Sequence, residues 1–281
     1  MIKLILQFFA IMPLRLNHSI GSMIGHYLNF SNSESKKVVS KNITTCFPQL
    51  DRIEQQNLIK NCLIETGKGL SEMGFVWLRS FSNNAKHVTK TIGAELLHTD
   101  QPTILLVPHF GCWEMVARMS SLQRPSVFLY KKLANQEQNK LLLASREQGD
   151  LTMASADKKG VIKIQRAINN KQLIGILPDQ DPGEEGGVLS PFFNTNARTM
   201  TLLVRLARKN NAKVVLSWAY RLPNGQGYEL NYKSVDVLSE SGDIADDVQM
   251  MNQEIESLVE THPEQYLWNY KRFKSVINYS S

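Results

Sequence analysis

The sequence predicts an α/β fold: a mixed, mostly parallel central sheet flanked by helices, with N-terminal helices that associate with a membrane. Three observations lead to this prediction. Short continuous apolar runs at 103–107, 126–130 and 173–177 are typical of strands buried on both faces. Helix-length segments alternate with these runs, which favours a parallel sheet. Two later strand-like runs flank the turn PNGQG at 223–227, which predicts a hairpin and therefore a mixed sheet.

Size and composition indicate an ordinary globular chain. It has 281 residues, of which 42% are hydrophobic and 21% charged, and this excludes a disordered protein. The net charge of +6 suits a polyanionic partner, whether nucleic acid, anionic lipid or an acidic protein, without choosing among them. Cys46, Cys62 and Cys112 lack the CxxC spacing of zinc clusters, so we expect reduced thiols in a cytosol-facing protein.

Residues 1–30 form a predicted membrane-associating segment. They carry only two full charges, Lys3 and Arg15. Their apolar run, 4–14, is shorter than the ~20 residues of a spanning helix, and a proline interrupts it. No small-residue A-x-A cleavage site follows, which disfavours a secretory signal. A segment lying on the membrane surface fits best, and a spanning helix with polar interruptions or a plain core helix are the alternatives.

Two helical regions follow, at 34–48 and 51–80, before the α/β body begins near residue 90. We treat 31–281 as one α/β domain with this helical lead-in. Gly67, Gly69 and Gly74 make the second helix a poor isolated helix, so we expect close packing to support it. Five further helices, two hairpin strands and one loop complete the expected order: helices at 113–122, 135–148, 161–170, 199–210 and 243–261, strands at 212–222 and 228–238, and a loop at 178–187.

The first candidate catalytic side chains are His109 and Glu114. His109 lies just past the 103–107 run, at the sheet edge where α/β proteins build sites. On a continuous helix the two side chains would point roughly 140° apart, so they meet only if Gly111 bends the chain. A carboxylate on one ring nitrogen orients the imidazole, and the other nitrogen can then take a proton from an alcohol.

Two other interpretations of this stretch stay open. A histidine and a glutamate five residues apart occur by chance in many chains. Cys112 could in principle act as a covalent nucleophile beside the histidine, but three residues of tight turn give its sulfur no clear path to the ring.

The stretch PHFGCWE, 108–114, resembles the H-x-x-x-x-D/E signature of the glycerolipid and lysophospholipid acyltransferase superfamily. The glutamate is the form found in its lipid A branch, the late (secondary) acyltransferases of lipopolysaccharide synthesis. Three more segments agree in order and spacing, so that the resemblance runs from about residue 10 to 274: KNITTCFPQL, ILPDQDPGEEGGVLSPFFNTNARTM and HPEQYLWNYKRFK.

The resemblance implies an enzyme that moves a fatty acyl chain from acyl carrier protein, or acyl-CoA, to a hydroxyl of a lipid A precursor. It would act at the cytoplasmic face of the bacterial inner membrane and need no organic cofactor and no metal. His109 would be the general base, held by Glu114. Arg146, in the helix after the second strand, would contact a phosphate or the oxyanion, since the family carries an arginine there.

Six other residues are candidates for substrate binding, and each of them also has a purely structural alternative. Lys131, after the second strand, suits a lipid phosphate. Asp179 and Gln180, in the loop after the third strand, suit substrate positioning, because two nearby carboxylates are too few for a metal site. Phe192 and Phe193 could line an acyl groove or pack in the core. Arg198 lies at an expected helix start, where it could bind a phosphate.

Two rival functions remain. The protein could be an acyltransferase for another lipid, such as a lysophospholipid or an ornithine lipid. It could also be a non-catalytic, basic membrane-surface binding protein. Nucleic-acid binding is not expected, because the basic residues are scattered and no recognised module is present.

Overall fold

The computed structural model describes residues 2–279. Residue 1 of the predicted segment 1–30 and residues 280–281 of the predicted domain 31–281 lie outside the described residues. Its centre is a seven-stranded sheet of order β1-β9-β8-β2-β5-β3-β4. Every neighbouring pair is parallel except β8 and β9, so the predicted mixed, mostly parallel sheet is confirmed. The strands are β1 Val88–Ile92, β2 Thr103–Leu106, β3 Ser126–Tyr130, β4 Leu151–Ser155, β5 Leu173–Ile176, β8 Lys213–Arg221 and β9 Tyr228–Val235.

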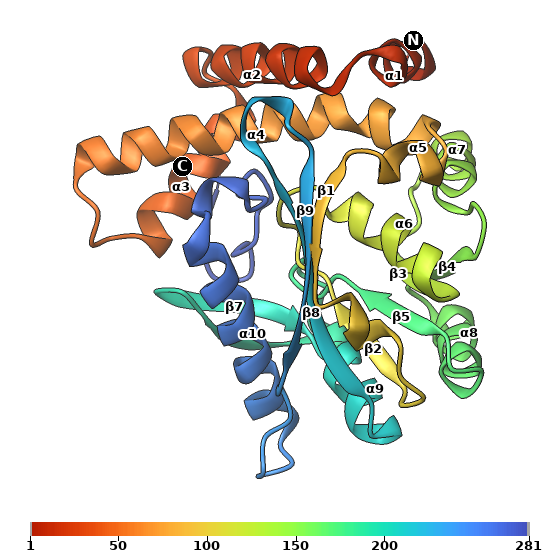
Figure 1. Cartoon of the computed structure of the whole chain (residues 1–281). Coiled ribbons are helices and arrows are strands. Elements are labelled where there is room, and N and C mark those ends of the chain that lie inside the picture. The colour runs from red at the N-terminus through yellow and green to blue at the C-terminus, as the bar shows by residue number, and fades with distance from the viewer. Residues whose placement is uncertain (1, 280–281) are drawn as a thin grey trace.

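Helices cover both faces of this sheet and one of its edges. Figure 1 shows α1 and α2 as an outer layer over the long α4, which lies across the top of the sheet in that view. The helices are α1 Ile2–Ile11, α2 Leu14–Phe30, α3 Glu34–Cys46, α4 Arg52–Leu78, α5 Phe81–Ala85, α6 Trp113–Gln123, α7 Gln136–Arg146, α8 Lys158–Asn169, α9 Leu202–Asn210 and α10 Ile244–Thr261. Short 3₁₀ turns lie at Ala94–Leu97, Glu184–Gly186, Pro223–Gly225 and Pro263–Gln265.

The continuous apolar runs are explained by burial on both faces. Ile104 and Leu106 point into one core cluster, together with residues of α8, α9 and α10. Leu105 and Val107 point into a second cluster, together with residues of α6. All four side chains are fully buried. A strand with a core on each side needs no polar face, so its sequence does not alternate.

The N-terminal helices pack closely because glycines let their backbones approach. A Cβ on Gly67 of α4 would lie 2.1 Å from the carbonyl oxygen of Gly21 of α2. A Cβ on Gly74 would lie 2.2 Å from the carbonyl oxygen of Leu6 of α1. The expected close packing is therefore confirmed at these two glycines. Gly69 is different, since a Cβ there would lie 3.9 Å from its nearest neighbour atom, Nη2 of Arg221.

Three parts of the sheet structure differ from the sequence prediction. The strands β1 and β4 were not expected, and neither was the antiparallel hairpin of β6 Gly187–Phe192 and β7 Thr195–Met200. The predicted helix at 199–210 begins only at Leu202, because β7 continues to Met200. In β7 the buried residues alternate, Ala197 and Thr199 facing inward, which is the pattern of a half-buried strand.

The outward surface of α1 and α2 carries many exposed apolar side chains. Leu6 and Phe9 of α1 are buried, whereas Leu4, Phe8 and Ile11 are 70%, 51% and 79% exposed. On α2 the exposed apolar side chains follow helical spacing: Leu16, Met23, Tyr27 and Phe30. Within residues 2–279, no helix combines the length and the apolar character that crossing a bilayer requires.

Candidate active site

Three polar side chains gather at the carboxyl edge of the central sheet. His109 follows β2, Asp179 follows β5, and Arg221 is the last residue of β8. These strands are neighbours in the order β8-β2-β5 and run parallel. Because the carboxyl ends of parallel strands meet at one edge, residues far apart in the sequence come together there, at the place where open α/β sheets bind ligands.

His109 is held by Asp179 through two hydrogen bonds. Its ring Nδ1 lies 2.7 Å from Asp179 Oδ1, and its backbone N–H donates to Oδ2 over 2.8 Å. The Asp179 side chain is 1% exposed and that of His109 is 13% exposed. Burial alone would raise the pKa of Asp179, but the charge of the neighbouring imidazole and these hydrogen bonds outweigh it and keep that pKa below its ordinary value.

This contact defines what the imidazole can do. A carboxylate on Nδ1 favours the tautomer with the proton on that nitrogen, and Nε2 is then the atom that can accept a proton. The Trp113 ring lies edge-on to the imidazole, with centroids 5.1 Å apart, and limits its rotation. The arrangement is that of an oriented general base.

The predicted contact between Glu114 and His109 is wrong in this structure. Glu114, in the first turn of α6, forms a two-pronged ion pair with Arg146 of α7, through Nε at 3.1 Å and through Nη2. Asp179, bonded to Nδ1, takes the role of the carboxylate that was expected to hold the ring. The predicted bend at Gly111 is present, with φ of +56°. The position of Asp179 directly after a buried run was the signal for this partner.

The backbone of the histidine loop is fixed by two distant segments. A Cβ on Gly111 would lie 2.1 Å from the carbonyl oxygen of Ala219 in β8, so only glycine allows this approach. The Gly111 N–H donates to the carbonyl oxygen of Gln265 over 2.9 Å. The Leu267 N–H donates to the carbonyl oxygen of His109 over 3.0 Å. The motif near the C-terminus therefore supports the loop that carries the histidine.

The other predicted residues are placed as follows. Lys131 is exposed beyond the end of β3, and Gln180 is half-buried beside Asp179. Phe192 is fully buried and Phe193 half-buried, with their ring centroids 5.0 Å apart, in an aromatic cluster with Trp268. The structure therefore gives both rings a packing role, and their contact with an acyl chain stays a prediction.

Arg198 does not open a helix, so the expected phosphate site at a helix N-terminus is wrong. It lies in β7, where its Nε donates to Ser275 Oγ over 3.3 Å. Its carbonyl oxygen accepts a hydrogen bond from the buried Arg272. The prediction failed because β7 extends to Met200 and α9 begins only at Leu202.

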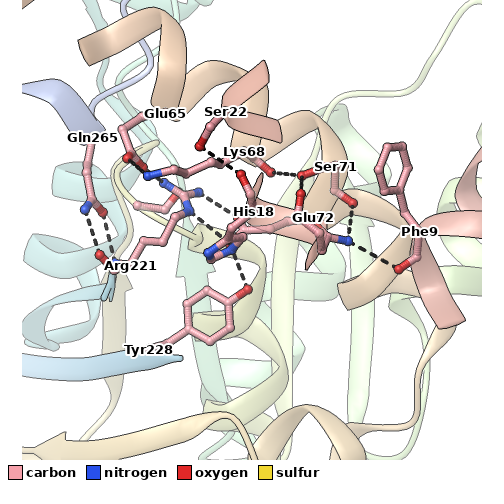
Figure 2. Close-up of polar contacts among 12 residues, drawn as sticks. Phe9, His18, Ser22, Glu65, Lys68, Ser71, Glu72, Arg221, Tyr228 and Gln265 are labelled. Atoms are coloured by element: carbon pink, nitrogen blue, oxygen red, sulfur yellow. Dashed lines mark hydrogen bonds and ion pairs between the residues drawn. The ribbon is translucent and has the colours of Figure 1, made fainter. Parts of the chain in front are cut away.

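A buried charged cluster beside the histidine loop was missed by the sequence analysis. Figure 2 shows Arg221 between Glu72 and Glu65 of α4, with His18 of α2 and Tyr228 of β9 also directed at Glu72. These residues come from four elements spread over more than two hundred positions. No local spacing connects them, which explains why no sequence pattern predicted the cluster.

Comparison with known proteins agrees with this geometry. Residues 2–275 match the family described as bacterial lipid A biosynthesis acyltransferase. The lipid A biosynthesis lauroyltransferase of Escherichia coli K12 is 28% identical over 270 residues, covering 94% of this chain and 87% of that protein. The lipid A biosynthesis palmitoleoyltransferase of the same strain is 25% identical over 265 residues, covering 91% and 84%.

A third relative comes from another genus. The lipid A biosynthesis acyltransferase of Haemophilus influenzae Rd is 25% identical over 265 residues, covering 92% of this chain and 83% of that protein. The match to the family extends across nearly the whole chain and includes the histidine loop. This chain therefore belongs to the bacterial lipid A biosynthesis acyltransferase family and is an acyltransferase.

Proposed function

We propose that this enzyme transfers a fatty acyl chain from acyl carrier protein, or acyl-CoA, to a hydroxyl of a lipid A precursor at the cytoplasmic face of the inner membrane. The observation that carries the proposal is the His109–Asp179 pair at the carboxyl edge of the sheet. An oriented imidazole beside a buried carboxylate suits proton removal from an alcohol. Membership of a lipid A acyltransferase family supports the choice of acceptor.

The reaction follows from this pair. His109 Nε2 takes the proton of the acceptor hydroxyl while the oxygen attacks the thioester carbonyl carbon. A carbon–oxygen bond forms, and the charge of the former carbonyl oxygen must be stabilised. The carbon–sulfur bond then breaks, and the proton on the imidazolium passes to the leaving thiolate. Asp179 stabilises the imidazolium between these two steps.

Positive groups near this edge suit the phosphates of the acceptor. Arg146 uses Nε and Nη2 for Glu114, so its Nη1 group is not part of that ion pair. We assign Glu114 the role of orienting Arg146 toward an anionic group of the substrate or the oxyanion. Lys131 is exposed at the end of β3 and can contribute a further charge.

The apolar outer surface of α1 and α2 supports attachment to the membrane surface. Its exposed side chains are flanked by the exposed cations Lys3 and Arg15, which suit anionic headgroups. The same helices pack on α4, and α4 contacts the carboxyl edge of the sheet through Arg221. A lipid acceptor in the bilayer would then lie on the side of the molecule that carries His109.

The proposal is tested by transfer of a labelled acyl chain from acyl carrier protein to a panel of acceptors. The panel holds a lipid A precursor bearing Kdo sugars, a lysophospholipid and a lyso-ornithine lipid. We expect transfer to the first. His109→Ala and Asp179→Asn should each lower kcat by about 10²-fold or more, because general-base catalysis of this kind contributes about 10²–10⁴-fold.

Asp181→Asn is the matched control, since it changes a carboxylate of the same loop that bonds the Gly183 N–H and the Ser275 hydroxyl rather than the imidazole. It should retain most of the activity. Full activity in a folded His109→Ala protein would contradict the mechanism. Transfer only to another acceptor would keep the mechanism and change the substrate. No transfer from a competent donor to any acceptor would favour a lipid-binding protein.

A further inference from the structure

We infer that Arg221 is a positioning residue for the reaction, which holds the 109–112 loop and is itself fixed by Glu72 and His18 of the N-terminal helices. This inference rests on the proposed function, because it assumes that the loop carries the general base. It adds a role for the N-terminal helices, which support the 109–112 loop through a continuous chain of hydrogen bonds.

Gly111 is held through both of its backbone groups. Its carbonyl oxygen accepts a hydrogen bond from Arg221 Nη2 over 3.2 Å, and its N–H donates to the Gln265 carbonyl oxygen over 2.9 Å. Gln265 and Arg221 are joined in turn, since the Gln265 side chain bonds both the N–H and the carbonyl oxygen of Arg221 at 2.9 Å. Both backbone groups of Gly111, two residues from His109, are thus held by one connected unit.

The guanidinium of Arg221 is fixed by two carboxylates of α4. Arg221 Nε and Nη2 donate to the two oxygens of Glu72 at 2.9 and 2.6 Å, and Nη1 donates to Glu65 at 2.7 Å. The side chains of Arg221 and Glu72 are each 3% exposed. Every nitrogen of the fork has an assigned acceptor, so the planar group has one orientation.

Glu72 is anchored in turn by side chains of two further elements, α2 and β9. His18 Nε2 of α2 lies 2.6 Å from Glu72 Oε1, and the Tyr228 hydroxyl of β9 donates to the same oxygen over 2.8 Å. Figure 2 shows these side chains converging from the N-terminal helices on one side and the β8–β9 hairpin on the other. Burial raises the pKa of Glu72, but Arg221 and His18 lower it more, so the carboxylate stays charged.

The arrangement is better explained by positioning than by stability alone. A buried ion pair gains little over well-packed apolar side chains, because desolvation offsets most of the attraction. Such a pair does fix geometry, and Nη2 of Arg221, while bonded to Glu72, also donates to the Gly111 carbonyl oxygen in the loop of the general base. Small displacements of a catalytic group are costly, with about 1 Å capable of lowering a rate about 10²-fold.

The test compares Arg221→Lys with Arg208→Lys in the full-length enzyme. Arg208 is a matched control, because it also bonds both oxygens of a buried carboxylate, Asp247, at 2.9 and 2.6 Å, and it joins α9 to α10 rather than to the loop. Lysine keeps the charge but loses the fork in both variants. Below the unfolding temperature of each protein, Arg221→Lys should lower kcat at least tenfold with KM unchanged, and Arg208→Lys should stay within twofold of wild type.

A second measurement needs no turnover. Cys112 is 5% exposed and follows Gly111, and burial raises the pKa of its thiol, so a thiol reagent should label it slowly in the wild type. Peptide mapping should find at least tenfold faster labelling of Cys112 in Arg221→Lys, with no change in Arg208→Lys. Cys46, also buried, is the internal control for general unfolding.

The outcomes are separable. The inference is overturned if Cys112 of Arg221→Lys is labelled at the wild-type rate. It is also overturned if Arg221→Lys shows faster labelling but keeps the wild-type kcat, or if Arg208→Lys loses as much kcat as Arg221→Lys. In a His109→Ala background, Arg221→Lys should cause no further loss, because it acts through that histidine; a further tenfold loss overturns it. If the wild type transfers no acyl chain, the proposed function fails, while the labelling rate still reports whether Arg221 holds the loop.

Discussion

At the scale of single residues, the buried carboxylate of Glu72 keeps its charge in the folded protein. Glu72 is 2% exposed and its pKa lies far below the ordinary 4.5, because Arg221 and His18 outweigh the effect of burial. A carboxyl group with a lowered pKa in the folded state stabilises the protein fully above its unfolded pKa. That contribution is lost as the pH falls below it toward the folded value.

Glu72→Gln should therefore lower the free energy of unfolding at neutral pH by about 3–5 kcal/mol, since it leaves Arg221 buried without its main partner. The difference from wild type should be constant above about pH 5 and shrink as the pH falls below about 4.5. Urea unfolding of both proteins between pH 7 and pH 3 measures it. A difference that stays constant down to pH 3 would show that Glu72 titrates alike in the folded and unfolded chains.

At the scale of elements, sequence patterns predicted the three continuously apolar strands and the β8–β9 hairpin, and they missed β1, β4 and the β6–β7 hairpin. The runs of β2, β3 and β5 are continuously apolar, whereas most of β1 is exposed. His109 was found because it ends such a run. Its partner was misassigned because the order β8-β2-β5 is a property of the folded sheet. Glu114 was nearer along the chain, while Asp179 was nearer in space.

The packing of α2 on α4 gives a prediction at the same scale. Gly67→Ala should lower the free energy of unfolding by about 1–3 kcal/mol, because its Cβ would lie 2.1 Å from a backbone oxygen that cannot move alone. Gly69→Ala, in the same helix, should raise it by about 0.5–1 kcal/mol, because alanine favours helix and has room there. Urea unfolding compares the two. Equal stabilisation by both would mean that α2 and α4 are not in close contact in solution.

At the scale of the whole molecule, one end combines an exposed apolar surface with the sheet edge at which we propose the active site. α1 and α2 form the outermost layer over α4 in Figure 1. Phe8, Ile11 and Phe30 are 51%, 79% and 91% exposed on that layer. Exposed apolar side chains gathered along helices indicate an interaction surface. Since the acceptor of a lipid A acyltransferase family is a lipid, a bilayer is the surface we expect it to meet.

The double variant Phe8→Ser/Ile11→Ser should reduce binding to vesicles containing anionic phospholipid at least tenfold, measured by cosedimentation. Burial of each side chain in the interface is worth about 1.5–3 kcal/mol, so the loss of both exceeds a factor of ten. Ile162→Ser is the matched control, because Ile162 is 54% exposed on α8, away from this layer. Equal binding by the double variant and the wild type would place the membrane contact elsewhere on the protein. Transfer to a water-soluble acceptor should survive the double variant, since its substitutions leave the buried contacts of α1 and the His109–Asp179 pair in place.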